Sequence, residues 1–121
     1  MPHVSAKRLK EEEETALRSS LVEIFKIIGR DRSVSNSLGE LLTHTEMIML
    51  AKRLSIIYLV SQGVPTLDIA DILKTSTSTI QIVEKKFDRG GYQNLRRVFG
   101  KLESSLKKIL KRVSEGEYFN D

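Results

Sequence analysis

The chain has 121 residues, 40% hydrophobic and 30% charged, which predicts one globular domain with a modest core. It contains no cysteine, which excludes disulfides, thiolate catalysis and Cys-based zinc sites. The formal net charge of +4, whose basic surplus falls mostly in residues 91–121, suits a polyanion partner without requiring one.

The first predicted element is a long helix over about residues 4–28, which has no internal Pro or Gly and stops at Gly29. Its apolar residues thicken toward the C-terminal half, and we expect this face to lie across a second subunit. The run Glu11 to Glu14 reads as a solvated face near the helix start. The N-terminus lacks the apolar core of a signal peptide, and no apolar run approaches the roughly 20 residues that span a bilayer. We therefore expect a cytoplasmic protein without a membrane span.

A polar loop over residues 29–37 precedes a short helix predicted at Ser37 to Leu42. Thr43 and Glu46 have the spacing of a capping box, in which each side chain bonds to the other residue's backbone amide, so the next helix starts here. That helix is apolar over most of its circumference and runs to the Gln62-Gly63 break. We expect it to be the central core helix.

Residues 66–87, TLDIADILKTSTSTIQIVEKKF, predict two short helices joined by a tight turn. Apolar residues at helical spacing are interrupted once, by the polar stretch 74–79. Ala70 is small enough for the second helix to cross the first closely, and Ile80 and Val83 form the buried face of the second. This is the pattern of a DNA-reading helix-turn-helix, whose second helix presents its outward side chains to the major groove.

After a break at residues 88–91, residues 92–113 carry an a/d heptad seam. Such a seam needs a partner helix, either the long N-terminal helix or a copy of the same helix in another subunit. The seam consists of Leu95, Phe99, Leu102, Leu106, Ile109 and Val113. We thus expect an all-α domain over residues 1–113, with a loose polar tail at 114–121.

Residues 40–95 resemble the tryptophan repressor-like family, and most closely its tryptophan-repressor-related branch without an assigned corepressor. The resemblance is carried by the segments 42–43, 50–53, 58–59, 69–73 and 76–80, together with Glu46 and Gly63. It implies an intertwined homodimer whose two recognition helices meet successive major grooves.

The resemblance also implies a possible effector pocket, at Arg53 and Ile82. Arg53 matches one basic wall of the family's tryptophan pocket, whereas Ile82 replaces the arginine that helps to hold the indole ring. We therefore expect any small-molecule effector to be something other than tryptophan. A second departure is Lys74, which stands where the family's turn has glycine and costs roughly 1 kcal/mol if it is left-handed.

Gln81 is the leading candidate for base reading, because its amide can pair with N6 and N7 of adenine. Thr77 and Ser78 at the second helix start, and Thr66 at the first, can either cap a helix or contact DNA. Lys74 and Lys85 can contact phosphates, as can Lys86 and Arg89 beside them. The predicted DNA-binding residues are Thr66, Lys74, Ser76, Thr77, Ser78, Gln81 and Lys85.

The function predicted from these features is sequence-specific binding of double-stranded DNA by a homodimer, with transcriptional repression as its output. One alternative is a helical protein-interaction module that keeps the fold without binding DNA, motivated by Ile82 and Glu84 near the groove face. A replication-initiator type of module shares the motif but is normally joined to a nucleotide-hydrolysing domain, for which the chain is too short. We identify no catalytic constellation, metal-ligand spacing or phosphate loop, and expect no enzyme, metal or cofactor.

Overall fold

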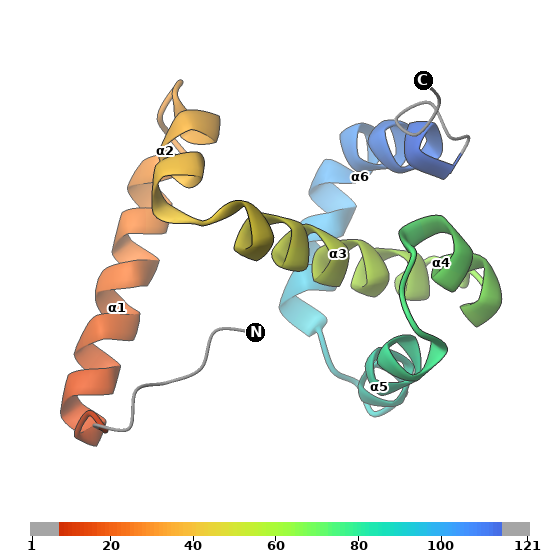
Figure 1. The fold of residues 1–121 in the computed structure, drawn as a ribbon, viewed down its shortest axis with the longest axis horizontal. Coiled ribbons are helices and arrows are strands. Elements are labelled where there is room, and N and C mark those ends of the chain that lie inside the picture. Colours follow the sequence, from red (N-terminus) through yellow and green to blue (C-terminus); the bar gives the residue numbers. More distant parts are fainter. Residues whose placement is uncertain (1–7, 115–121) are drawn as a thin grey trace. The chain divides into compact units, whose positions relative to one another are not determined.

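The computed structural model describes residues 8–114, except for the side chains of 102–107, 109–110 and 112–114. The described residues form six helices and no strand, which confirms the all-α class (Figure 1). We expected one domain over residues 1–113; contacts divide the chain into two compact units between Met49 and Leu50. The helices are α1 (Glu11–Ile28), α2 (Val34–Leu41), α3 (His44–Ser61), α4 (Thr66–Leu73), α5 (Thr77–Asp88) and α6 (Gln93–Ser114).

Helix α1 begins at Glu11, not near residue 4, and residues 8–10 are not helical. The backbone amide of Lys10 donates to Oε1 of Glu13 at 2.8 Å. The four glutamates of the first turn are favourable there, because the unpaired amides at a helix N-terminus carry partial positive charge. Residues 4–7 of the predicted helix lie outside the described part of the chain. The helix ends at Gly29, as predicted.

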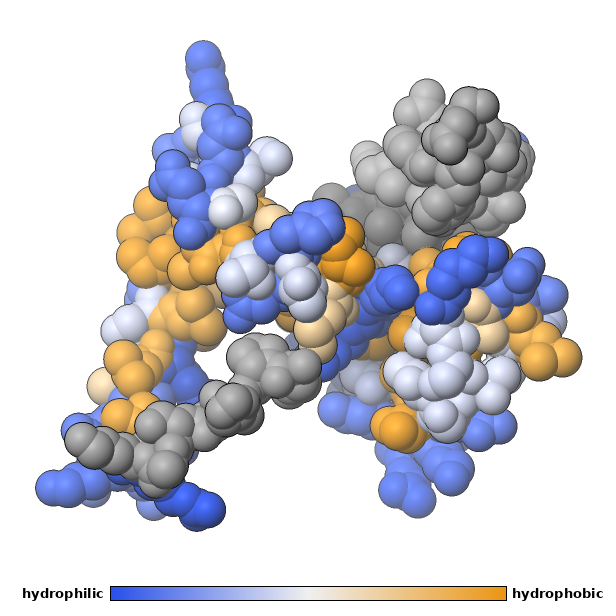
Figure 2. Space-filling view, viewed as in Figure 1, coloured by the Kyte–Doolittle hydropathy of each residue, from blue (hydrophilic) through white to orange (hydrophobic). Residues whose placement is uncertain are grey.

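None of the residues of α1 is buried, although α1 contacts α2. Six of its large apolar side chains are 38–63% exposed, and hydrophobic side chains gather along α1 in Figure 2. These residues are Leu17, Leu21, Val22, Ile24, Phe25 and Ile27. We call this set the α1 apolar face. Helix α2, the other complete helix in the described part of this unit, buries none of the six.

Helix α2 starts at Val34, three residues before the predicted start. The reason is local: the carboxylate of Asp31 accepts a hydrogen bond from the amide of Ser33 at 2.7 Å, which turns the chain into the helix early. The capping box before α3 is confirmed. The amide of Thr43 donates to Glu46 at 2.9 Å, and the amide of Glu46 donates to the Thr43 hydroxyl at 3.1 Å.

The core of the second unit is built on the C-terminal half of α3. The prediction that all of α3 is central was too broad, because Leu50 and Leu54 are 45% and 40% exposed. Only the end of the helix is covered by its neighbours in the chain. The buried residues are Ile56, Ile57, Tyr58, Leu59, Ile69, Leu73, Ile80, Val83 and Phe99.

Helix α6 begins by packing on this core. Leu95 is partly buried against it, and the ring of Phe99 meets that of Tyr58 edge to face at 5.2 Å. The first two positions of the predicted heptad seam are therefore used inside the chain. The side chains of Leu102, Leu106, Ile109 and Val113 lie outside the described residues, so their partner helix stays a prediction.

Three helices end in the same type of turn, with a residue in the left-handed conformation. Gly63 has φ +76° after α3, Lys74 has φ 53° after α4, and Gly90 has φ +85° after α5. In each turn the following amide reaches back five residues, as the amide of Gly91 does to the carbonyl of Lys86 at 2.9 Å. The break predicted at residues 88–91 is thus a defined turn.

Candidate nucleic-acid interface

Helices α4 and α5 form the predicted helix-turn-helix, with bounds within one residue of the expected segment. Ile69 and Ile80 are fully buried where the two helices meet. Ala70 packs against the core from α4, as expected for a small residue beneath a crossing helix. The contact fixes which side of α5 faces inward, and therefore which side faces solvent.

Helix α5 is capped by Ser76, not by Thr77 or Ser78. The Ser76 hydroxyl accepts from the amide of Thr79 at 3.3 Å and lies 3.1 Å from the Ser78 hydroxyl. Capping requires an extended residue just before the helix, and Ser76 has φ −75° and ψ 149°. Thr77 is the first helical residue, so the cap lies one residue earlier than predicted.

The outward side of α5 is polar and cationic, apart from one isoleucine, Ile82, and one carboxylate, Asp88. Buried residues recur at Ile80 and Val83, and the positions between them point away from the core. The exposed residues that were predicted to face DNA are Ser76, Thr77, Ser78, Gln81, Ile82 and Lys85. We call these residues the α5 outer face. Their contacts with DNA stay a prediction.

Thr66 does not cap α4, because Pro65 takes the N-cap position and Thr66 is the first helical residue. Its part-buried hydroxyl donates to the Glu84 carboxylate, at 2.9 Å to Oε1 and 3.0 Å to Oε2. A carboxylate is a stronger acceptor than a neutral group. This bond ties the start of α4 to the middle of α5, so the Thr66 hydroxyl already has a partner. A pairing across two helices left no signal in the sequence.

Lys74 adopts the left-handed conformation that its position in the turn implied, with φ 53° and ψ 53°. Its ammonium lies 3.8 Å from Asp71, and both side chains are largely exposed, so this ion pair contributes little to stability. The carbonyl of Lys74 accepts from the ammonium of Lys52 at 3.3 Å. Lys52 thus supports the turn from α3, a role that sequence reasoning missed.

A shallow hollow lies at the C-terminal end of α5, lined by Ile82, Lys85, Lys86, Arg89 and Gly91. The ammonium of Lys86 sits 4.7 Å from the centre of the Tyr92 ring, in a cation–π contact. Among the described residues, no salt bridge includes Lys85 or Arg89. The hollow is therefore apolar at Ile82 and positively charged around it.

The predicted effector pair is not brought together in this hollow. Ile82 lines it, whereas Arg53 is exposed on α3 and is not among the lining residues. Binding of an effector at these residues stays a prediction.

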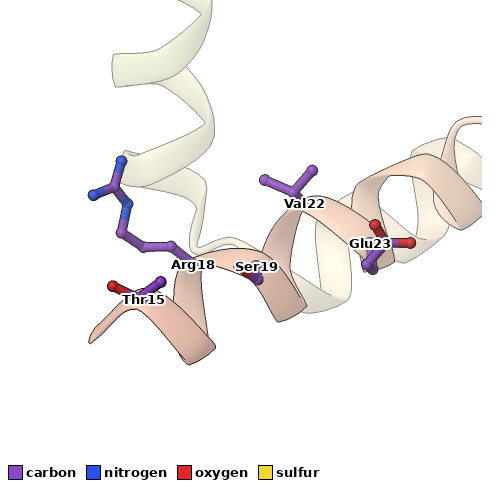
Figure 3. A pocket seen from close by; sticks show the side chains of 5 residues that line it. All are labelled: Thr15, Arg18, Ser19, Val22 and Glu23. Carbon is purple, nitrogen blue, oxygen red and sulfur yellow. The ribbon is translucent and has the colours of Figure 1, made fainter. Parts of the chain in front are cut away.

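A second hollow runs along α1, where Figure 3 shows Thr15, Arg18, Ser19, Val22 and Glu23 on one helix. A surface lined by a single helix encloses no ligand, since binding sites are concavities that bury most of their occupant. Among the side chains that the structure describes, no three of His, Asp or Glu gather as metal ligands. None of the described helices is long and apolar enough to cross a membrane.

Residues 50–96 match the family model of a homeodomain-like domain. The match begins within α3, includes all of α4 and α5, and ends near the start of α6, covering less than half of the chain. Neither a curated protein nor a solved structure matches the chain.

The match supports DNA binding by the helix-turn-helix. In homeodomain-type modules the third helix enters the major groove, and α5 is the third helix of the matched segment. The match does not single out the tryptophan repressor-like branch, and that finer resemblance stays a prediction.

Proposed function

We propose that this protein binds double-stranded DNA in a sequence-specific manner as a homodimer and regulates transcription, acting as a repressor by occluding polymerase. The observation that carries the proposal is the division of α5 into two sides. Ile80 and Val83 are buried in the core, while the α5 outer face is exposed and is polar or cationic except at Ile82. This division lies inside the segment that matches a homeodomain-like domain.

The chemistry of the α5 outer face suits a major groove. Gln81 offers a donor and an acceptor that match N7 and N6 of adenine, a contact worth about 1–3 kcal/mol of discrimination. Lys85, with Arg89 beyond it, supplies cations for phosphates, which set affinity and salt dependence. Asp88 is exposed on the same side of α5, seven residues after Gln81. Glu84, on the flank of this side, is held by Thr66 and is only partly exposed. Repulsion of DNA by that carboxylate is thereby reduced.

The homodimer is supported by the α1 apolar face. Six large hydrophobic side chains on one helix are at least 38% exposed, and such patches mark interaction surfaces. A second copy of the chain brings the same face, so the two can cover each other in a two-fold symmetric contact. Two copies of α5 then suit two half-sites separated by about one turn of DNA.

A protein-interaction module is the alternative, and the exposure of Ile82 favours it. Ile82 is 69% exposed on the side of α5 that we assign to DNA. The second argument for this alternative was the negative charge of Glu84. That argument is weaker now, because the Glu84 carboxylate accepts a hydrogen bond from Thr66. Retention on random duplex DNA at about 0.15 M salt separates the two functions, since a phosphate-contacting dimer still binds there.

Selection of bound fragments from random duplex DNA with the full chain tests the proposal. We expect a palindromic consensus with half-sites about 10 base pairs apart. Gln81→Ala should relax the preference at one position of each half-site. Lys85→Ala should weaken binding to all duplexes and lower the salt slope by about one, whereas Lys26→Ala, a cation on α1, should change neither. Equal binding of selected and random duplexes would overturn sequence-specific recognition.

A further inference from the structure

We propose that Ile82 reads a thymine in the major groove, by packing its side chain against the 5-methyl group of the base. The inference rests on the proposed function and adds to it the identity of one recognised base. It gives Ile82 a role that needs no small-molecule effector.

The exposure of Ile82 separates it from every other large apolar residue of α5. Ile80 is 0% exposed, Val83 is 7% exposed and Phe87 is partly buried, whereas Ile82 is 69% exposed. An exposed isoleucine contributes nothing to the core of its own chain. It follows directly on Gln81 and lies one turn before Lys85, so it shares the surface with the predicted base and phosphate contacts.

The surroundings of Ile82 suit DNA better than an apolar protein surface. Its hollow is shared with Lys85, Lys86 and Arg89, and contains no other large aliphatic side chain. An apolar protein partner would have to bury these cations, which is costly without acidic counterparts. On DNA the same cations would lie beside phosphates, and the isoleucine side chain would pack against an apolar group on a base edge in the major groove.

Thymine provides that group. Among the four bases only thymine carries a methyl group at C5, and this methyl projects into the major groove beside the hydrogen-bonding edge. The Gln81 amide can read an adenine in the same region. The two neighbouring side chains therefore predict a half-site that contains A·T pairs at the position of α5.

Single exposed hydrophobic residues are common on protein surfaces, so the experiment must detect energetic coupling between Ile82 and a methyl group. After selection of the consensus, each thymine in a half-site is replaced in turn by uracil, which removes only the methyl. Affinities are measured for the native chain, for Ile82→Ala and for Leu67→Ala. Leu67 is the matched control, since it is 74% exposed but lies on α4.

We expect one uracil replacement to weaken the native chain about fourfold, the effect of uncovering one methyl-sized group. Ile82→Ala should bind the thymine and uracil duplexes equally, and Leu67→Ala should keep the native difference. A consensus without A·T pairs opposite α5, no uracil effect in the native chain, or an equal effect in Ile82→Ala would each overturn the assignment. In all three cases a selected consensus would leave the proposed function standing. A failure to select any consensus would overturn both.

Discussion

The helix-turn-helix and α1 carry similar amounts of apolar side chain and use it differently. In α4 and α5 the key residues Ile69 and Ile80 are 0% exposed, because a short turn returns α5 onto α4 over the end of α3. In α1 the most apolar stretch of the helix has no buried residue. Apolar periodicity thus predicts that a face will be covered: α4 and α5 bury apolar residues against each other and α3, whereas α1 and α2 bury none of theirs.

The two regions are therefore expected to be stabilised in different ways. The core around α4 and α5 is closed by residues of the same chain and should fold independently of concentration. The α1 apolar face is not buried by α2, and in the proposed homodimer its burial would depend on protein concentration.

The strongest test compares two isoleucines of α5. Ile80→Ala should lower the free energy of unfolding by about 2–5 kcal/mol, because it leaves a cavity at a fully buried site. Ile82→Ala, two residues along the same helix, should change it by less than about 0.5 kcal/mol. Urea denaturation followed by circular dichroism measures both. Similar losses in the two variants would contradict the assigned inward and outward sides of α5.

The second test places charge on the α1 apolar face. Leu17→Glu combined with Ile24→Glu should raise the dimer dissociation constant at least 100-fold, roughly 2.7 kcal/mol, because both residues lie on one side of the helix. Sedimentation velocity over a range of concentrations measures the change. Ser19→Glu, on the opposite side, should leave it unaltered. A native chain that sediments as a monomer, or a double variant that still dimerises, would refute the dimer.

The third test adds one methyl group to each of the two units. A Cβ at Gly91 would lie 2.8 Å from the carbonyl oxygen of Lys86, so Gly91→Ala should destabilise the second unit by about 1–3 kcal/mol. A Cβ at Gly39 of α2 meets nothing within 4 Å, and Gly39→Ala should stabilise its helix by up to about 1 kcal/mol. Thermal denaturation measures whether each substitution raises or lowers the melting temperature. Destabilisation by Gly39→Ala would show that this part of α2 is covered in solution.

The smallest expected effect is a pH dependence at the start of α3. The backbone amide of Thr43, followed by its hydroxyl, lowers the pKa of Glu46 below its usual value. Because the pKa is lower in the folded state, the stabilisation is complete above the unfolded pKa and is lost as the pH falls through the folded one. Melting temperatures from pH 7 to about pH 2.5 should fall more steeply for the native chain than for Glu46→Gln. Parallel curves would contradict this.

The features that the sequence predicted best are those determined over a few residues. The capping box of Thr43 and Glu46 and the buried positions of α5 depend on spacing within one or two turns. The left-handed conformation of Lys74 was implied by the resemblance, because the family's turn has glycine at this position. In each case the local pattern and the tertiary packing favour the same structure.

The features that were missed depend on pairs of residues far apart in the chain or on competition between neighbours. A cap of α4 was one of the two roles considered for Thr66. Its hydrogen bond with Glu84 was missed, because a partner 18 residues away leaves no pattern in the sequence. Lys52 reaches the turn after α4 from 22 residues away. Ser76 competes with Thr77 and Ser78 for one capping position, and backbone geometry, not residue type, decides between three hydroxyls.

The division of α5 into two sides also has a practical consequence for protein engineering. The residues that fix the helix in place, Ser76 as cap, Ile80 and Val83 in the core, and Glu84 on Thr66, are distinct from those at the exposed positions between them. A combinatorial library that varies only Thr77, Ser78, Gln81, Ile82 and Lys85 would leave every buried side chain unchanged. The scaffold could then be reprogrammed toward new target sequences without redesign of its fold.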